Sequence, residues 1–369
     1  MIKEGKLGLS EAICLVTLVT VTKMFYTSIR VVIELTATAA WYSTFISAID
    51  ALIAFFIIYL LMKRFQGYDL VEIFEKVTGK IIGRILSLVF CTYFIYYAGS
   101  NLREFLEMIK AYNLPYTPPS LILFAFILSV IVLAYLGLET IARVSRPSFF
   151  IVMFGVISIM ILASTNYNID RLFPLGGYGI QETLYHGFFR GSAYDEVIIL
   201  TFIANSMNGI RDFKKAGFIS LILTAIGFSS TMLCAIIAFE YPAGGENLSS
   251  LFQLSRIINL SRFLQRLESL FLFIWVIASL ITVATSFFIA LSIYCKTFKI
   301  DNHKPLLLPC GFLTFMIAIL PESLSELTEM NIVFIRQYSM FFVFGIPILV
   351  FFLSLLLGKK GGKLKNEKN

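Results

Sequence analysis

Long apolar runs alternate with short polar segments along almost the whole chain, and this pattern predicts ten membrane-spanning helices. A helix needs about 20 mainly apolar residues to cross a hydrocarbon core about 30 Å thick. The third and eighth runs are long enough to tilt or protrude. The predicted spans cover approximately residues 9–35, 40–62, 81–110, 118–137, 141–163, 190–208, 216–239, 262–295, 305–320 and 338–357.

Composition agrees with an all-α polytopic membrane protein that has no sizeable soluble domain. The chain is 58 % hydrophobic and only 14 % charged, whereas a soluble domain is about one quarter charged. Backbone polar groups inside lipid must pair within their own segment, which favours helices. Between spans two and three, residues 67–80 are amphipathic and predict a short helix at the membrane surface.

The distribution of lysine and arginine predicts the orientation of the spans. The N-terminus, the 2–3, 4–5, 6–7 and 8–9 loops and the C-terminal tail hold 20 of the 30 basic residues, and the opposite side holds nine. Cytoplasmic segments carry the excess of these residues. We therefore expect both termini in the cytoplasm, with a basic tail over residues 358–369.

Ten spans divide into two halves of five, and an odd number of spans inverts the second half relative to the first. The expected repeats cover about residues 9–163 and 190–357 of a single transmembrane domain. In inverted-repeat transporters the ligand lies near the midplane, where corresponding helices of the two halves are interrupted. Interrupted spans at positions one and six would therefore indicate the binding site.

Span one carries a lysine deep within the membrane. Lys23 lies 14 residues after Leu9, about 21 Å along a helix. A charge at that depth costs at least about 2.5–3.5 kcal/mol and normally faces a partner, a cavity or a substrate. The alternative is that the lysine stem extends outward to the headgroups, but the remaining distance of about 9 Å favours a buried partner.

Span six is interrupted as well. Its clean apolar run covers only residues 197–204, and Asp195 and Glu196 stand directly before it. Eight residues cannot cross a bilayer, so the two carboxylates lie within the membrane or at its edge. Either they face the interior, or they occupy the outer headgroup zone.

Polar stripes on spans three and eight predict the walls of a central cavity. Tyr93 and Tyr97 lead a stripe on span three that continues through Ser100, Asn101 and Glu104, and span eight carries Trp275, Ser279, Thr282 and Ser286 at steps of 4, 3 and 4. Hydroxyl groups also join helices to one another in membranes, so helix packing is the alternative for each residue. Asp50 lies within span two, and its role is open at this stage.

Several motifs together resemble the B subunit of bacterial spore germinant receptors, the spore germination permease family, within the amino acid–polyamine–organocation superfamily. The resemblance extends over essentially the whole chain and depends on the order of the motifs more than on any one of them. The motifs are TAAW at 38–41, KRFQG at 63–67, LREF at 102–105, LETIAR at 138–143, RFLQRLE at 262–268 followed by Trp275, and KPL at 304–306.

This resemblance implies a fold of the leucine-transporter type and a receptor in the inner spore membrane. The receptor would bind a small germinant, commonly an amino acid, and its partners would be an A and a C subunit in the lipid bilayer. Two positions depart from the family pattern. In span one the family typically has a glycine followed by Thr or Ser, where this chain has Thr22-Lys23. In span six it has a glycine before the glutamate, where this chain has Asp195 before Glu196. We expect Lys23 to pair with Asp195 or Glu196 across the substrate cavity. Lys23 would then either occupy the position at which related transporters hold sodium or bind the germinant carboxylate directly.

The resulting prediction is a germinant-binding, transporter-like subunit that signals germination. The alternatives are a proton-coupled amino-acid permease of the same fold and an ion or water pathway. We predict no catalytic residues, cofactor, metal site or nucleic-acid partner, since five cysteines and two histidines are scattered without ligand spacing. The predicted ligand-binding residues are Thr22, Lys23, Met24, Thr27, Tyr93, Tyr97, Tyr194, Asp195, Glu196, Trp275, Ser279, Thr282 and Ser286.

Overall fold

A computed structural model describes residues 5–239, 248–259, 267–327 and 336–361 of the chain. These residues form helices joined by short connections, with one isolated parallel bridge between Leu7 and Met207. The helices are α1 (Leu9–Val21), η1 (Thr22–Phe25), α2 (Ser28–Thr36), η2 (Ala37–Ala39), α3 (Ala40–Arg64), α4 (Leu70–Thr78), α5 (Lys80–Tyr112), α6 (Pro119–Leu136), α7 (Leu138–Leu162), η3 (Ala163–Asn166), η4 (Ile169–Leu172), α8 (Ile180–Phe188), η5 (Gly191–Ile198), α9 (Ile199–Phe202), η6 (Ala204–Ser206), α10 (Ile210–Ala238), α12 (Ser250–Ile257), α13 (Glu268–Phe298), η7 (Lys304–Leu306), α14 (Leu307–Ile319), α15 (Leu324–Leu327), α16 (Arg336–Val343) and α17 (Gly345–Leu356).

Seven helical stretches within the described residues are long and apolar enough to cross a membrane. They are Ser28–Arg64, Lys80–Tyr112, Pro119–Leu136, Leu138–Asn166, Ile210–Ala238, Glu268–Phe298 and Tyr338–Leu356. Lys304–Ile319 is a shorter apolar helix at the predicted ninth span. The all-α class is confirmed, while the count of ten spans stays a prediction because predicted spans one and six are broken into short pieces.

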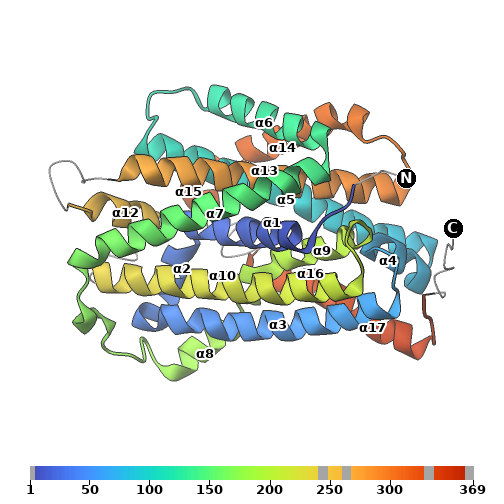
Figure 1. Cartoon of the computed structure of the whole chain (residues 1–369), viewed down its shortest axis with the longest axis horizontal. Coiled ribbons are helices and arrows are strands. Elements are labelled where there is room, and N and C mark those ends of the chain that lie inside the picture. The colour runs from blue at the N-terminus through green and yellow to red at the C-terminus, as the bar shows by residue number, and fades with distance from the viewer. Residues whose placement is uncertain (1–4, 240–247, 260–266, 328–335, 362–369) are drawn as a thin grey trace.

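The long helices run roughly parallel to the long axis of the molecule, and both chain ends lie at the same end of the bundle (Figure 1). The short helix α1 packs against α7, α10 and α13, and α5 packs against α13. Close approach of α3 and α10 depends on Gly217, because a Cβ there would lie 1.9 Å from Phe55 Cζ. Small residues at such contacts allow membrane helices to pack tightly.

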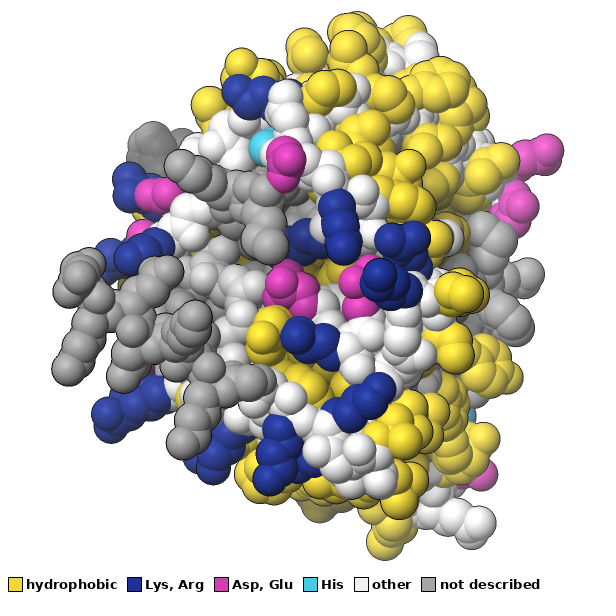
Figure 2. Space-filling view, turned by 90° about the vertical axis from the view of Figure 1, so that its right-hand side faces the viewer, with side chains coloured by type: hydrophobic (Ala, Val, Ile, Leu, Met, Phe, Trp, Pro, Cys, Tyr) yellow, Lys and Arg dark blue, Asp and Glu magenta, His cyan; other side chains and the backbone are white. Residues whose placement is uncertain are grey.

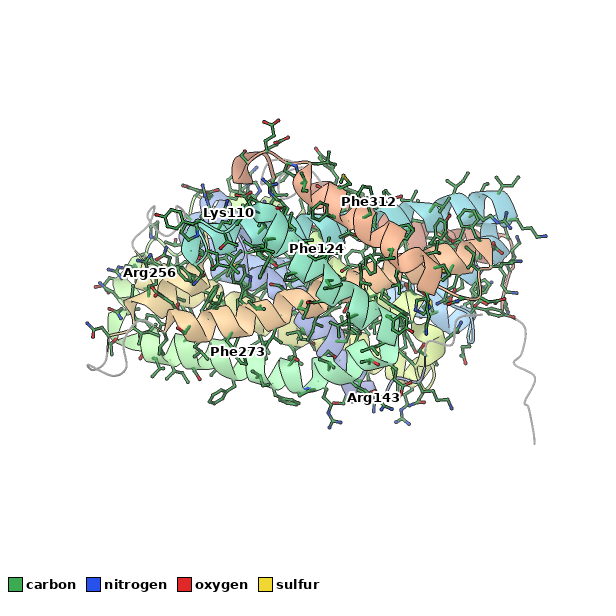
Figure 3. All side chains as sticks on the ribbon, turned by 90° about the horizontal axis from the view of Figure 1, so that it is seen from above. Lys110, Phe124, Arg143, Arg256, Phe273 and Phe312 are labelled. Atoms are coloured by element: carbon green, nitrogen blue, oxygen red, sulfur yellow. The ribbon has the colours of Figure 1, made fainter. Side chains whose placement is uncertain are left out.

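The outer surface of the bundle is apolar along its length. Phe124 on α6, Phe273 on α13 and Phe312 on α14 point outward (Figure 3) and are more than half exposed. A soluble monomer rarely exposes large contiguous apolar surface, whereas lipid tails accommodate it. This chain is accordingly a multi-pass membrane protein.

The predicted surface helix is present as α4, which begins with a capping box. Asp69 accepts a hydrogen bond from Glu72 N at 3.0 Å, and Glu72 accepts one from Asp69 N at 3.0 Å. Such reciprocal bonds satisfy two of the backbone donors that a helix start leaves open. Two sequence predictions lie outside the described residues: the 262–266 part of the RFLQRLE motif, and the tail beyond residue 361.

Candidate functional site

The first break interrupts the helix that starts at Leu9. Regular α-helix ends at Val21, a 3-10 turn covers Thr22–Phe25, Tyr26 is extended, and α2 starts at Ser28. Thr22 and Lys23 therefore lie in irregular backbone, as their polar interruption of the apolar run predicted. Broken helices at membrane depth occur where the backbone lines a cavity or is buried in protein.

The second break lies between α8 and α9. Residues Gly191–Ile198 form the 3-10 segment η5, which presents Asp195 and Glu196 to the interior. Both residues are buried, with 1 % and 2 % of their surfaces exposed. Both carboxylates therefore face the interior of the protein.

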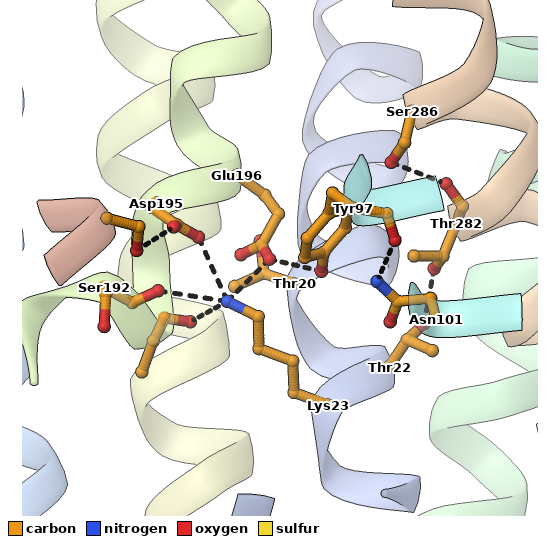
Figure 4. A network of polar contacts seen from close by, with 12 residues as sticks. Thr20, Thr22, Lys23, Tyr97, Asn101, Ser192, Asp195, Glu196, Thr282 and Ser286 are labelled. Atoms are coloured by element: carbon orange, nitrogen blue, oxygen red, sulfur yellow. Dashed lines mark hydrogen bonds and ion pairs between the residues drawn. The ribbon is translucent and has the colours of Figure 1, made fainter. Parts of the chain in front are cut away.

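The two breaks meet at a buried ion cluster. Lys23 Nζ lies 2.6 Å from Glu196 Oε1 and 3.1 Å from Asp195 Oδ1. It also donates to the backbone oxygens of Ser192 at 3.1 Å and Ala193 at 3.2 Å (Figure 4). The expected ion pair is thus present with both carboxylates, and the lysine stem does not extend to the headgroups.

Three hydroxyl groups orient the carboxylates of the ion cluster. Tyr93 donates to Asp195 Oδ2 at 2.6 Å, Ser339 donates to the same oxygen at 3.0 Å, and Tyr97 donates to Glu196 Oε1. Hydrogen bonds to charged acceptors are stronger than neutral ones. Helices α5 and α16 are therefore tied to the second break through its acidic residues.

Burial makes this ion cluster sensitive to the loss of any one member. Removing one partner of a buried ion pair costs about 3–5 kcal/mol because the remaining charge stays desolvated. Here one ammonium faces two carboxyl groups, and Glu196 Oε2 is buried without a hydrogen-bond partner in the described structure. The unpaired oxygen marks a place where a further donor could bind.

Glu104 occupies the N-terminal end of α2. Its Oε1 accepts hydrogen bonds from Thr27 N at 3.0 Å and from Thr27 Oγ1 at 2.5 Å, and the side chain is 1 % exposed. The N-terminus of a helix attracts negative charge because its backbone N–H groups lack partners. A carboxylate from α5 thus pairs with the hydrogen-bond donors of Thr27 in the first break, on the α2 side of Lys23.

The predicted stripe on α13 packs closely against the first break. Thr282 Oγ1 lies 2.8 Å from Thr22 Oγ1, Tyr26 donates to Ser279 Oγ at 2.9 Å, and Ser286 donates to Thr282 O at 2.9 Å. Trp275 is fully buried and packs against other aromatic rings. The stripe joins helices in this conformation, and its part in ligand binding stays a prediction.

A small cavity, here called the side cavity, lies next to Lys23. Its volume is about 50 Å³, and its lining residues come from both breaks and from α2, α3 and α10. The predicted stripes on α5 and α13 do not line it, and hydroxyl groups on α13 bond instead to carbonyls of their own helix and to Thr22 in the first break. The lining residues are Lys23, Ser28, Ile29, Val32, Ser43, Thr44, Ser47, Arg190, Ser192, Ala193, Tyr194, Phe228 and Met232.

The remaining predicted residues are also placed close to the breaks. Tyr194 lines the side cavity and donates to Thr44 O at 3.0 Å. Met24 is buried, with its sulfur 3.9 Å from Thr231 Oγ1. Asp50 on α3 has a buried Oδ2 that lacks a hydrogen-bond partner in the described structure, and a Cβ at Gly191 would lie 2.6 Å from that oxygen.

Sequence reasoning missed two contributions to the site. Ser339 contacts Asp195 across 144 positions of sequence, and no periodicity singles it out. The hydroxyl stripe of Ser43, Thr44 and Ser47 on α3 was detectable, because positions four apart share one face of a helix.

Comparisons with a family model and with known proteins point to one group of proteins. A family model described as "Spore germination protein" matches residues 6–327. Spore germination protein KB of Bacillus subtilis is 23 % identical over 89 % of this chain and 90 % of its own length. Spore germination protein A2 of the same organism is 24 % identical over 84 % and 85 %.

Solved structures of transporters share the fold. Mhp1, a nucleobase–cation symport-1 family transporter in a closed conformation with bromovinylhydantoin bound, superposes with a TM-score of 0.71 at 12 % identity, covering 94 % of this chain and 78 % of that one. A Na⁺-coupled sialic acid symporter in a substrate-bound outward-open state gives 0.65 at 11 % identity, covering 98 % and 92 %. The fold is therefore that of the leucine-transporter type, and these relatives and neighbours are germination proteins and transporters rather than enzymes.

Proposed function

Since this chain belongs to the spore germination permease family, we propose that it is the membrane-embedded subunit of a germinant receptor. It binds a small germinant, an amino acid by preference, in mid-membrane at the two helix breaks, and the binding signals germination. The observation that carries the proposal is the buried contact of Lys23 with Asp195 and Glu196, which joins the breaks.

The chemistry of the ion cluster suits a ligand with charged ends. An ammonium and two carboxylates complement the carboxylate and ammonium of an amino acid. The ligand carboxylate would pair with Lys23 and the ligand ammonium with the acidic residues, in place of the pairs within the cluster. A ligand shifts a conformational equilibrium only through different affinities for the two states. Opening of the ion cluster would provide that difference, because the breaks are held together by it in this conformation.

We propose that the spore inner membrane is the site of action, with A and C subunits as partners. The end of the bundle that carries both termini presents many lysine and arginine side chains (Figure 2), as expected for a cytoplasmic face. The proposed topology has ten spans in two inverted repeats, about 9–163 and 190–357, and the positions of the two breaks support it.

A double-mutant cycle tests the proposal in spores. Lys23→Met and Asp195→Asn should each impair the response to germinant, measured as loss of optical density, and the double variant should be less impaired than additivity predicts. Residues in contact typically show coupling energies of about 0.5–3 kcal/mol. Thr285→Val is the matched control, because Thr285 is buried and, among the described residues, its hydroxyl bonds only to Ile281 O of its own helix. Strict additivity would remove the ion cluster from germinant sensing.

Uptake measurements separate a receptor from a permease. Purified full-length chain in proteoliposomes should bind labelled amino acids without concentrating them, with and without a proton gradient. Robust concentrative uptake that is lost in Lys23→Met would favour the proton-coupled transporter instead.

A further inference from the structure

Asp50 is an acidic residue in mid-membrane that takes no part in the ion cluster. It lies on α3, ten residues after Ala40 and 14 before Arg64, the two ends of the helix. At 1.5 Å per residue these separations are about 15 Å and about 21 Å, so the side chain lies well inside a hydrocarbon core about 30 Å thick. Asp50 is half-buried, and the neighbouring Ile49 and Ile53 are each 57 % exposed. It thus lies at the boundary between the protein interior and the lipid-facing surface.

The carboxyl group of Asp50 packs against the start of the second break. A Cβ at Gly191, the first residue of η5, would lie 2.6 Å from Asp50 Oδ2 and 3.1 Å from Met340 Sδ on α16. A side chain at position 191 would therefore collide with the carboxyl group. One turn earlier on α3, Ser47 donates to Gly187 O at 2.7 Å. The contact of α3 with the second break thus includes the ionisable group itself.

Nothing in the described structure compensates a charge on Asp50. Its Oδ2 is buried without a hydrogen-bond partner, and no lysine, arginine or histidine of the described residues pairs with it. Met340 offers a thioether sulfur, which donates no hydrogen bond. The hydroxyl of Ser47 is already used by Gly187 O. Ionisable groups at this depth normally have a partner or take part in proton transfer, and Asp50 has no partner.

The titratable groups on the elements around Asp50 do not interact with it either. Arg30 and Glu34 on α2 pair with each other, the charged residues of α10 lie within 211–215, and α17 has none. The others are Glu182 and His186 on α8, Arg190 before η5, Tyr194, Asp195 and Glu196 on η5, and Tyr338 on α16. A negative charge on Asp50 would therefore be unopposed.

We propose that Asp50 is a proton-binding site and that it carries a proton in this conformation. A lone carboxylate in apolar surroundings takes up a proton rather than stay charged. A metal cation would need several more oxygen ligands, and the described residues contain no group of acidic, histidine or cysteine side chains that could hold one. Loss of the proton would place a charge against Gly191 and Met340 and favour separation of α3 from the second break.

Covalent labelling with dicyclohexylcarbodiimide tests the protonation. This apolar reagent reacts with protonated carboxyl groups. In purified full-length protein at about pH 7 it should label Asp50, located by peptide mass spectrometry, and labelling should fall by up to about tenfold per pH unit once the proton is lost. Glu104 is the internal control and should stay unlabelled, because its carboxylate accepts two hydrogen bonds from Thr27.

Three results of the labelling would overturn the proposal. They are no labelling of Asp50, labelling that does not change between about pH 6 and about pH 10, and labelling that sodium suppresses while N-methylglucamine at the same pH does not. The last result would assign the site to a metal cation instead of a proton.

The variant Asp50→Asn separates the proton from the packing. Asparagine has the shape of the neutral acid and cannot ionise, so it should fit against Gly191 and abolish the labelling. As pH rises from about 5 to about 8, the unfolding temperature of wild type should fall relative to that of Asp50→Asn, because the folded state holds a proton that the unfolded chain has released. Glu34→Gln is the control, since Glu34 is 43 % exposed at its side chain in a pair with Arg30, and its difference from wild type should not follow pH.

A difference between wild type and Asp50→Asn that stays constant with pH would contradict the proton site. The inference goes beyond the proposed function, because neither labelling nor unfolding involves a germinant. Failure of the proton site would leave the receptor proposal standing, and additive effects of Lys23→Met and Asp195→Asn on germination would leave the proton site standing.

Discussion

Lys23 and Lys296 each pair with a buried carboxylate, but in different surroundings. Lys23 is 3 % exposed at its side chain and is enclosed by two carboxylates and two backbone carbonyls. Lys296 is 18 % exposed, pairs with Asp69 at 2.9 Å and donates to Phe202 O at 2.8 Å. It lines a larger cavity of about 910 Å³ at the end of the bundle that carries the termini. Water can screen the pair of Lys296 with Asp69 but not the pairs of Lys23. Loss of the lysine charge should therefore destabilise the protein more at Lys23 than at Lys296.

The largest effect should come from Lys23→Met. The substitution leaves two carboxylates desolvated, and we expect the free energy of unfolding to fall by about 3–5 kcal/mol. Thermal unfolding of purified protein in detergent measures the change. Lys299→Met, at an exposed lysine on the terminal face, should stay within about 0.5 kcal/mol of wild type. Equal unfolding temperatures for the two variants would show that the ion cluster does not stabilise this conformation.

Glu196→Gln should have a smaller effect than Lys23→Met. The glutamine keeps the size of the side chain and an acceptor for Tyr97, and Lys23 keeps Asp195 as its partner. One ammonium then faces one carboxylate, so we expect a loss of about 1–3 kcal/mol, as for a lost hydrogen bond to a charged group. Thermal unfolding at the same pH tests the order of the two variants, and a larger loss for Glu196→Gln than for Lys23→Met contradicts the charge argument.

Lys296→Met should cost less than either change at the ion cluster. Asp69 retains its capping bond from Glu72 N, and the exposed fraction of Lys296 already allows water to solvate the pair. We expect a loss of about 1 kcal/mol that shrinks as salt is raised, because mobile ions screen exposed pairs more than buried ones. Unfolding temperatures measured from low to high salt check this, with Lys23→Met as the salt-insensitive reference.

The smallest effect concerns Glu72 beside the Lys296 pair. Burial, reinforced by the nearby charge of Asp69, raises the pKa of Glu72 above its ordinary value of 4.5. A raised pKa means that the folded state holds the proton more tightly, so this contribution to stability is present at low pH and is lost as pH rises through the raised pKa. Glu72→Gln cannot ionise, and its unfolding temperature should therefore improve relative to wild type between about pH 4 and pH 8. A difference that does not vary with pH would contradict the raised pKa.

Much of the fold could be predicted from the sequence because lipid imposes strong rules. The length of apolar runs fixes helices such as α5 and α13, and a charge inside such a run requires a partner, which pointed to Lys23, Asp195 and Glu196. The walls of the side cavity were not predicted, because they depend on how four helices are rotated about their axes. The contact of Ser339 with Asp195 was equally inaccessible, since it joins residues that no local pattern relates.

One backbone contact gives the second break a route to the start of the chain. Leu7 N donates to Ser206 O at 2.8 Å, just beyond α9, which follows the segment that holds Asp195 and Glu196. Any displacement of α9 must therefore either move the segment around Leu7 with it or break this hydrogen bond. Through Leu7, a rearrangement of the second break would reach the end of the bundle at which the termini lie.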